Sequence, residues 1–388
     1  MKIVFVTGTR ADYGKLKSLI SICDNDVELE THVYITGMHL LKEHGFTCDD
    51  VIADGYKKIY IADNAVHNGR MDANLANTIL NFSDYVRTIN PDLIVVHGDR
   101  TDPLAAAIVG VLNNIRIAHI EGGEVTGTVD EFLRHAISKL SSLHFVANEE
   151  SKYRLIQLGE REDTLHIIGS PDIDIMLSDN LPEINDVKNR HFIGYDDYAI
   201  FIYHPVTTSS TLSKDINEVV YALNQSGLNY IVIHPNNDHG AECINNQLEL
   251  LKNNSKFKMF KSLPFEDFIV LLKHSNFIIG NSSAGIREAC IYGVPAIDIG
   301  TRQNKRYEIS ILKNIQHTIE NSAEILQCIK SVDKHKHASV YFGEGRSAEL
   351  FHAIIKNKRI INGDLQKVFI EMDVTAAAIQ NYMNEVCF

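Results

Sequence analysis

Short apolar runs alternate with segments of helical periodicity along most of the chain. In the first part the runs are KIVFV, HVYIT, LIVVH, RIAHI, LHFVA and LHIIG, and the helical segments between them are YGKLKSLISIC, DANLANTILNFSDYVRTI, DPLAAAIVGVLNN and EFLRHAISKL. Uninterrupted apolar runs are typical of strands buried on both faces, and strand–helix alternation is typical of parallel sheets covered by helices. The pattern therefore predicts a doubly wound α/β fold.

The alternation stops once, after GSPDIDIML. Residues 178–198 are polar, contain Pro182 and keep no sustained period, which is typical of a linker between domains. The alternation then resumes with AIFIYH, a helix near 213–225, NYIVIH, a helix near 240–253, a strand near 257, FEDFIVLLKH, FIIGNSS, GIREACIYG and PAIDIG. A length of 388 residues also favours two cores over one. We predict two similar α/β domains, 1–177 and 199–362, and a tail of unknown role at 363–388, where VTAAAIQNYMNEVCF has helical spacing.

Composition and charge narrow the range of partners. The net charge of −13 argues against a nucleic-acid partner, which needs an excess of Lys and Arg on one face, whereas a small phosphorylated ligand needs only a local positive site. The six cysteines are far apart and form no CxxC pair, which fits a reducing compartment better than a disulfide framework or a zinc site. MKIVFVTGTRADYG is interpreted as a first strand and not a signal peptide, and no run of about 18 apolar residues predicts a membrane span. We expect a cytoplasmic protein.

Polar and ionisable residues follow the predicted strands directly. The segments are VTGTR, HGDRTD and HIEGGE in the first domain, and YHPVTT, IHPNND and IIGNSSAGIRE in the second. Ligands of open α/β sheets bind outside the carboxyl ends of the strands, so these segments mark a candidate site in the crevice between the domains.

Each of these segments also has a purely structural explanation. Asp99 and Asp102 can be helix N-caps, and Asp130 and Glu131 can place charge in the first turn of a helix. The combination favours a ligand site, because simple loops do not require the polar residues found at the same edge, which include Arg10, His204, Asn236 and a Ser-Ser pair.

GNSSAGIRE joins the end of a strand to a helix predicted to start near Ser283. Ser282, Ser283 and the following backbone N–H groups would then form a helix N-terminus open to a phosphate, and Glu288 can accept hydrogen bonds from ribose hydroxyls. The alternative is that one serine is only an N-cap. The chain has no GxGxxG after its first strand and no GxxxxGKS or GxxxxGKT, so neither a dinucleotide nor a P-loop nucleotide is indicated. A phosphate site in the second of two α/β domains instead indicates a sugar nucleotide.

Together these segments resemble the hydrolysing UDP-N-acetylglucosamine 2-epimerases of sialic acid and related nonulosonic acid biosynthesis. The matching segments are GTRADYGKL, HGDRTD, HIEGGEVTGTVDEFLRHAISKL, YHPVTT, PFEDFIVLLKHSNFIIGNSSAGIREA and IDIGTRQ, in family order from residue 1 to about residue 355. The acidic segment is specific to the hydrolysing branch, whereas the non-hydrolysing epimerases resemble the chain at Arg10, Asp99 and Glu121. The resemblance implies an α/β fold with two Rossmann-like domains whose parallel sheets face a central cleft, as in GT-B glycosyltransferases.

The resemblance also implies a reaction that needs no cofactor and no metal. The sugar loses UDP and its C2 proton to give a 2-acetamidoglycal, and water then adds to yield free N-acetylmannosamine. Asp99, Glu121 and Asp130 are the implied acid–base set, because carboxylates held close together in a cleft can have divergent pKa values. His204 matches a family histidine that acts on the diphosphate or as an acid.

The implied ligand-binding residues are spread over both domains. Those at the diphosphate are Arg10, Ser282, Ser283 and Arg302, with Glu288 at the ribose, Phe265 at the uracil, and Asn236, Arg100 and Arg134 elsewhere at the substrate. Arg100 and Arg134 fit salt bridges equally well, and Lys15, on the first helix, is interpreted as a solvated residue.

The loop after GTRQ departs from the family pattern. Family members usually have a Gly-rich run there, whereas this chain reads NKRYEISIL and keeps only Arg306. Since that loop would lie beside the ligand, the substrate is either UDP-N-acetylglucosamine or a UDP-2,4-diacetamido sugar. Two other functions stay open: a GT-B glycosyltransferase, which the acidic cluster at 121–131 counts against, and a non-catalytic sugar-nucleotide sensor, which needs no acid triad. We expect a homodimer or homotetramer.

Overall fold

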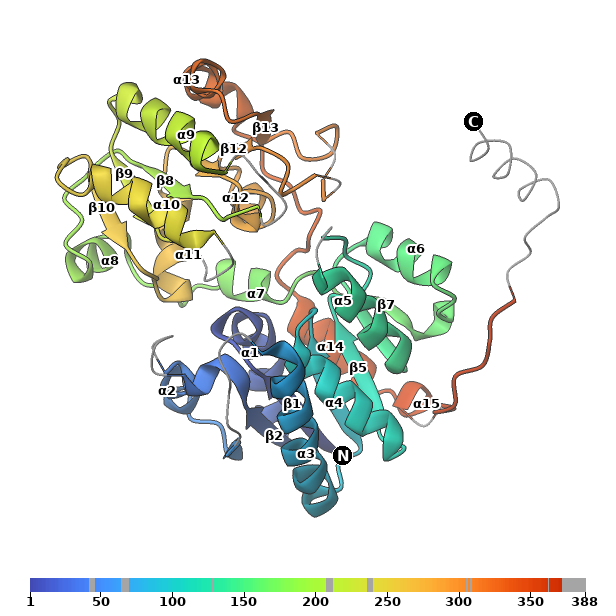
Figure 1. The fold of residues 1–388 in the computed structure, drawn as a ribbon. Coiled ribbons are helices and arrows are strands. Elements are labelled where there is room, and N and C mark those ends of the chain that lie inside the picture. Colours follow the sequence, from blue (N-terminus) through green and yellow to red (C-terminus); the bar gives the residue numbers. More distant parts are fainter. Residues whose placement is uncertain are drawn as a thin grey trace, which may run out of the picture.

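The computed structural model describes residues 1–41, 46–63, 70–126, 129–206, 212–235, 240–304, 306–307, 309–361 and 363–371. Two α/β domains, each built on a parallel sheet, lie one above the other in Figure 1. The predicted fold class is confirmed.

The first sheet has the strand order β3-β2-β1-β4-β5-β6-β7, with every pair parallel. Its strands are β1 (Lys2–Thr7), β2 (Glu30–Ile35), β3 (Ile59–Ile61), β4 (Leu93–His97), β5 (Arg116–Ile120), β6 (Leu143–Val146) and β7 (Leu165–Ile167). All strands predicted here are confirmed. The edge strand β3 was not predicted, because it is short and largely exposed and so lacks a buried apolar run.

Helices cover both faces of this sheet. They are α1 (Arg10–Asn25), α2 (Cys48–Ala53), α3 (Met71–Ile89), α4 (Thr101–Leu112), α5 (Val129–Leu140), α6 (Glu149–Gln157) and α7 (Asp172–Met176). Side chains alternate along β1, so Phe5 joins the core on one face and Val6 the core on the other. The helix α1 begins at a capping box in which Thr9 and Asp12 bond to each other's backbone N–H groups.

The second sheet has the strand order β10-β9-β8-β11-β12-β13 and is also entirely parallel. Its strands are β8 (Ala199–Ile202), β9 (Tyr230–Ile233), β10 (Phe257–Phe260), β11 (Ile278–Gly280), β12 (Ala296–Ile299) and β13 (Ile315–Thr318). The covering helices are α9 (Leu212–Ser226), α10 (Ala241–Leu248), α11 (Phe265–Lys273), α12 (Glu288–Tyr292) and α13 (Ser322–Ser331). The predicted strands and helices of this domain are present, and β13 is an additional edge strand.

The segment predicted to be a linker contains a helix, α8 (Ile184–Arg190), and packs on the second domain. Val187 is fully buried, and Arg190 and His191 bond Asp267 of α11 at 2.6 and 2.7 Å. The helix buries a single apolar side chain, so its sequence shows no amphipathic period.

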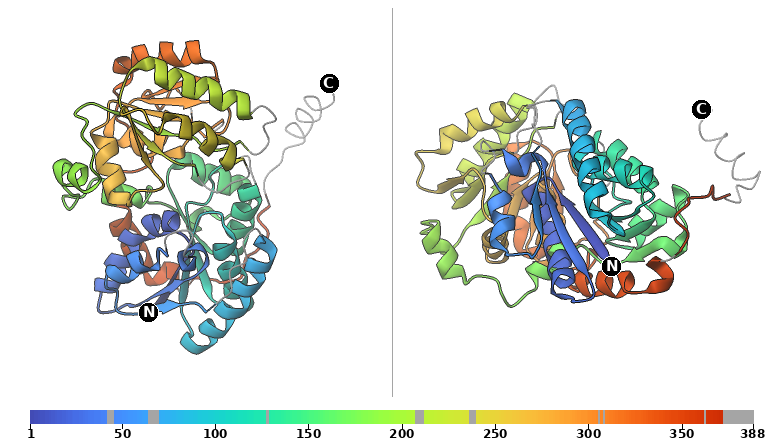
Figure 2. Two further views of the ribbon diagram at one scale, coloured as in Figure 1. Left: turned by 60° about the vertical axis from the view of Figure 1, so that its left-hand side comes forward. Right: turned by 90° about the horizontal axis from the view of Figure 1, so that it is seen from below.

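The last two helices of the described chain lie after the second domain in sequence, and the first of them packs on the first domain. Helix α14 (Ser347–Ile355) returns to the first domain and packs against α1, as Figure 2 shows, and α15 (Lys358–Ile361) follows it. Phe351 of α14 lies in the first core, with its ring centroid 4.7 Å from that of Phe145. The predicted extent of the second domain, 199–362, therefore needs correction at residues 347–355.

Little of the predicted tail falls within the described residues. The carbonyl of Gly363 accepts a hydrogen bond from Arg116 at 2.6 Å, which holds the start of the tail beside β5. The segment with helical spacing, VTAAAIQNYMNEVCF, lies outside the described residues. In the part of the chain that is described, no helix is both long and apolar enough to cross a membrane.

Candidate active site

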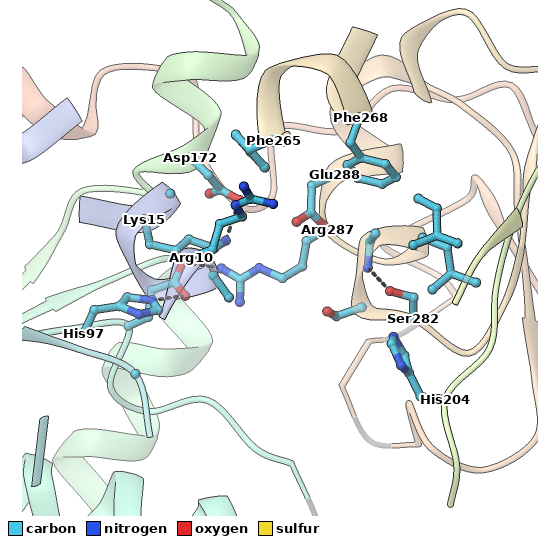
Figure 3. Close-up of a pocket in the computed structure, with 18 of the residues that line it drawn as sticks. Arg10, Lys15, His97, Asp172, His204, Phe265, Phe268, Ser282, Arg287 and Glu288 are labelled. Atoms are coloured by element: carbon cyan, nitrogen blue, oxygen red, sulfur yellow. Dashed lines mark hydrogen bonds and ion pairs between the residues drawn. The ribbon is translucent and has the colours of Figure 1, made fainter. Parts of the chain in front are cut away.

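A cavity of about 510 Å³ lies between the two domains, where the carboxyl ends of both sheets converge (Figure 3). Eleven of its lining residues come from the first domain: Arg10, Ala11, Gly14, Lys15, His97, Gly98, Asp99, Glu121, Glu124, Arg134 and Asp172. Of the residues predicted from sequence, those that line it are Arg10, Asp99, Glu121, Arg134, His204, Phe265, Ser282, Ser283 and Glu288. The sequence thus located the cleft at the correct edge of both sheets.

Glu121 occupies a sharp turn directly after β5. Its backbone has φ 61°, a left-handed conformation that costs a residue other than glycine about 1 to 3 kcal/mol. Gly123 completes the turn at φ 77°, and a Cβ there would lie 2.2 Å from the carbonyl oxygen of Ser151, so only glycine fits. This turn directs the Glu121 side chain toward the cavity, where the carboxylate is 7% exposed.

The Glu121 carboxylate is surrounded by donors from four separate segments. Arg287 Nη2 lies 2.5 Å and His97 Nε2 3.0 Å from its oxygens. The Ser170 hydroxyl donates to it, and Lys15 Nζ is 3.5 Å away. Glu121 is therefore a buried anion held by an arginine of the second domain and by donors of the first.

The electrostatics of Glu121 follow from these neighbours. Burial alone would raise the pKa of Glu121, but attraction by Arg287 and then by Lys15 outweighs burial and lowers it well below its usual value. Lys15 keeps its proton as well, because Asp172 and Glu121 raise its pKa against the opposing effects of burial and of Arg287. Glu121 and Lys15 are therefore both ionised at neutral pH.

Two of these cations were not recognised from sequence. The interpretation of Lys15 as a solvated residue is wrong, since its side chain is 14% exposed and its Nζ lies 2.5 Å from Asp172 and 3.0 Å from Ser170. Arg287 belongs to the GNSSAGIRE segment, in which only the two serines and Glu288 were predicted to bind the ligand. The available signal was an adjacent pair of charged residues, Arg287 and Glu288, inside an otherwise mostly apolar stretch, AGIREACIYG.

Asp99 and Arg134 form a partly buried ion pair at the same wall of the cavity. Arg134 is 3% exposed and also donates to the carbonyl of Glu124 at 3.0 Å. Of the two roles left open for Arg134, the structure shows the salt bridge. Glu124 itself lines the cavity and lies 3.2 Å from Arg287 Nη1.

Asp130 is not brought into the main cavity. It lines a neighbouring cavity of about 150 Å³ together with Arg100 and Asp102. Burial, and then repulsion by Asp12, raises the pKa of Asp102 to about 6. The resemblance predicted that Asp130 and Arg100 lie at the substrate with Asp99 and Glu121. In the structure, Asp130 and Arg100 line a different cavity from Asp99 and Glu121, which differs from that expectation.

The second-domain wall carries the serine pair and Glu288. Ser282 accepts a hydrogen bond from the N–H of Ala284 at 3.3 Å and caps a 3-10 turn, Ser283–Gly285. The helix was predicted to start near Ser283, but it starts at Glu288 as the short helix α12, because a 3-10 turn comes first. Burial raises the pKa of Glu288, and its Oε2 is buried without a hydrogen-bond partner among the described residues.

The remaining predicted residues have different surroundings. The backbone N–H of His204 donates to Asn281 at 2.6 Å, which fixes the loop after β8. Arg10 pairs with Asp50 at 2.7 Å and is 36% exposed. Arg302 donates to the carbonyl of Asn281 at 3.1 Å and does not line the cavity. Asn236 lies outside the described residues.

Arg306, which the sequence keeps from the family pattern, reaches the cavity from the loop after β12. It donates to the carbonyl of Val125 at 3.0 Å, and burial lowers its pKa to about 10. The described residues contain no group of three or more His, Cys, Asp or Glu side chains placed to hold a metal ion.

Comparison with known proteins identifies the family. A family model described as UDP-N-acetylglucosamine 2-epimerase matches residues 21–356. The chain belongs to this family. A UDP-N-acetylglucosamine 2-epimerase of Neisseria meningitidis serogroup B is 44% identical over 96% of this chain and 100% of its own length. A UDP-N,N'-diacetylbacillosamine 2-epimerase (hydrolyzing) of Legionella pneumophila is 33% identical over 92% of this chain and 95% of its own.

Solved structures share the fold of the family. The UDP-GlcNAc 2-epimerase of Neisseria meningitidis bound to UDP-GlcNAc superposes with a TM-score of 0.78 at 20% identity, covering 92% of this chain and 100% of that one. The Methanocaldococcus jannaschii enzyme in complex with UDP-GlcNAc and UDP gives a TM-score of 0.78 at 21% identity, covering 92% and 99%. At these identities the likeness establishes the two-domain, GT-B-like architecture.

Proposed function

We propose that this member of the family is a hydrolysing 2-epimerase, which converts UDP-N-acetylglucosamine to UDP and the free 2-epimeric sugar. One observation carries the proposal: the carboxylates of Asp99 and Glu121 and the Ser282–Ser283 turn line a single cavity from opposite domains. A sugar bridging the cavity would present C2 to the acids and its diphosphate to the second domain. The Legionella relative, named as hydrolysing, supports this choice within the family.

The reaction divides into two steps that carboxylates can serve. In the elimination, a carboxylate takes the C2 proton, the C1–O bond breaks, and UDP leaves with the electron pair, so that a C1=C2 double bond forms. In the hydration, an acid returns a proton to C2 from the opposite face, water adds its oxygen to C1, and a carboxylate base takes the proton that the water loses. Both steps need positioned acids and bases, for which we assign Asp99 and Glu121 of the main cavity, together with Asp130, which the family resemblance implies and which lines the neighbouring cavity.

The leaving diphosphate needs positive charge, which the cavity supplies. Arg10, Arg287 and Arg306 line it, and all carry fixed charge at neutral pH. Charge-assisted hydrogen bonds from guanidinium groups would stabilise the negative charge that develops on the departing UDP. We assign Ser282 and Ser283 to the phosphates, Glu288 to the ribose hydroxyls and Phe265 to the uracil, with His204 beside the diphosphate.

A UDP-2,4-diacetamido sugar is the second candidate substrate. The Legionella relative is named for such a sugar, and this chain has NKRYEISIL where family members usually have a Gly-rich run. Arg306 from this loop reaches the carbonyl of Val125, beside the acidic turn. The loop therefore adjoins the region where the sugar substituents would lie.

Incubation of the protein with UDP-N-acetylglucosamine alone, and with a UDP-2,4-diacetamido sugar in parallel, tests the proposal. Proton and phosphorus NMR would follow the products. Free 2-epimeric sugar plus UDP supports hydrolytic epimerisation. A UDP-linked epimer would assign the chain to the non-hydrolysing branch, no reaction without an acceptor would favour a glycosyltransferase, and binding without turnover would favour a sensor.

We place the enzyme in the cytoplasm, since the described cysteines are all free thiols, in keeping with a reducing compartment. The homodimer or homotetramer expected from the family resemblance stays a prediction, which light scattering of the purified protein tests directly.

A further inference from the structure

Arg287 connects the two domains through the acidic turn. It comes from the second domain, just before α12, and Figure 3 shows its side chain extending across the cavity toward Lys15 and His97. Its Nη2 lies 2.5 Å from Glu121 and 2.8 Å from Ser170, and its Nη1 lies 3.2 Å from Glu124. A single guanidinium therefore bonds two carboxylates that lie 166 and 163 residues away along the chain.

The Arg287 guanidinium also packs against an aromatic ring, and one of its three nitrogens has no hydrogen-bond partner among the described residues. Its central carbon lies 5.0 Å from the ring centroid of Phe342, a cation–π arrangement that sets the plane of the group. Its Nε is buried without a hydrogen-bond partner among the residues described. The side chain is 15% exposed and lines the cavity, so a ligand in the cavity can reach it.

The groups that face Glu121 come from every element packed around it. Lys15 of α1 and His97 of β4 approach the carboxylate from the first domain, and Asp172 of α7 holds Lys15. Arg287 is the contribution of the second domain, with Glu288 beside it on α12 and Glu124 on the acidic turn. Of these groups, Arg287 is the cation in shortest contact with Glu121.

We propose that Arg287 is a positioning residue that a bound diphosphate draws away from Glu121, so that occupation of the second domain releases the carboxylate of the first for reaction. This inference rests on the proposed function. A diphosphate carries more charge than the carboxylates and accepts two parallel N–H bonds from a guanidinium, so it competes effectively for Arg287. The empty enzyme would then hold its base inactive, and the leaving group of the substrate would activate it.

Release changes the basicity of Glu121 in the required direction. Attraction by Arg287 is the strongest influence that lowers the pKa of Glu121. When the guanidinium turns to the diphosphate, the largest effect that lowers the pKa of Glu121 is lost while burial remains, so the pKa of Glu121 rises. A carboxylate with a higher pKa is the stronger general base for a weakly acidic C2 proton.

A double-mutant cycle on UDP affinity tests the competition without any need for turnover. Glu121→Gln frees Arg287, so calorimetry should show tighter UDP binding than in the wild type, by about 5-fold or more. In an Arg287→Gln background the same Glu121→Gln change should alter UDP affinity by less than about 2-fold, because the competition is absent. Equal effects of Glu121→Gln in both backgrounds would overturn the inference.

Two controls separate competition from simpler causes. Asp99→Asn removes a carboxylate from the same wall, but Asp99 pairs with Arg134, so its effect on UDP affinity should be the same in both backgrounds. Arg287→Lys keeps the charge but cannot bond Glu121 and Glu124 together, and it replaces Arg287→Gln if the latter variant does not fold. In the Arg287→Lys background, Glu121→Gln should tighten UDP binding by less than it does in the wild type, but it should still tighten it.

The pH dependence of turnover supplies an independent readout. The acid limb of kcat/KM reports Glu121 in the free enzyme, and that of kcat reports it in the complex. The wild type should lose kcat at a higher pH than kcat/KM, and the two midpoints should lie closer together in Arg287→Lys than in the wild type. A purely structural role would leave the separation of midpoints unchanged.

The same measurements distinguish failure of this inference from failure of the proposed function. If the wild type binds no UDP, the proposed function fails and this inference with it. If UDP binds but the effects of the two substitutions on its affinity are additive, only the inference is refuted.

Discussion

Lys15 Nζ lies 2.5 Å from Asp172 Oδ2, and this pair joins the first helix of the chain to the point where the chain leaves the first domain. Asp172 is 1% exposed, so its charge has little contact with water. Removing the partner of a buried charge is far more costly than removing a surface ion pair. The pair thus holds Lys15 in place, with its Nζ 3.5 Å from the Glu121 carboxylate at the cavity wall.

Lys15→Met should therefore lower the free energy of unfolding by about 3 to 5 kcal/mol. Lys17, on the same helix, is the matched control: it pairs with Asp54 and Glu266 at 3.0 Å but is 31% exposed. Lys17→Met should cost about 1 kcal/mol or less. Urea unfolding followed by tyrosine fluorescence and circular dichroism measures both, and equal losses would show that the burial of Lys15 has no energetic consequence.

Asp130→Asn should reduce turnover by about 10²- to 10⁴-fold with the fold intact, if Asp130 acts with Asp99 and Glu121 as an acid or base. The adjacent Glu131→Gln is the control, because Glu131 accepts a hydrogen bond from the backbone of Thr126 at 2.9 Å and the amide oxygen can still accept it. Its activity should stay near the wild-type value. An active Asp130→Asn enzyme would mean that the neighbouring 150 Å³ cavity takes no part in the chemistry.

Asp102 should make stability depend on pH. Burial and then Asp12 raise its pKa from 3.8 to about 6, so the folded state favours the protonated acid. Its contribution is complete below pH 4 and is lost as the pH rises through 6, and the whole change corresponds to about 3 kcal/mol. Asp102→Asn removes this loss, so its unfolding free energy relative to wild type should increase by about 1 kcal/mol between pH 5 and 7. A constant difference across that range, measured by urea unfolding, would contradict the assignment.

Phe351→Ala should destabilise the first domain, although residue 351 follows the whole second domain in the chain. The ring is fully buried against Phe145 and Phe5, and such truncations cost about 3 to 5 kcal/mol. Leu350, its neighbour, is 39% exposed, and Leu350→Ala should cost less than about 1 kcal/mol. Hydrogen exchange should show the Phe351→Ala loss in β1 and β6. Loss confined to the second domain would contradict the packing of α14.

The strands and the position of the cleft were predictable because each depends on a local pattern. A buried parallel strand requires an uninterrupted apolar run, and Glu121, Asp99 and the serine pair directly follow such runs. The strands β3 and β13 were not predicted, because β3 is short and largely exposed and β13 has Gln316 and His317 at its centre, so neither is an uninterrupted apolar run.

The partnerships across the cavity were not predictable, because they join residues that are distant in sequence. Lys15 meets Asp172 157 residues later, and Arg287 meets Glu121 166 residues earlier. A charged residue on a helix is usually solvated, so nothing local marked Lys15 as buried, and the apolar stretch around Arg287 was a local signal that did not identify its partner. The return of α14 has the same origin, since an amphipathic helix does not specify which core it covers.

Solvent deuterium incorporation tests the central claim most directly. Elimination and hydration at the cavity between Glu121 and the Ser282–Ser283 turn would replace the C2 hydrogen of the sugar with one from solvent. In heavy water, UDP-N-acetylglucosamine should yield UDP and the free 2-epimeric sugar with one deuterium at C2, visible as the loss of the C2 proton signal by NMR. A free 2-epimer that retains its original C2 hydrogen would contradict the account.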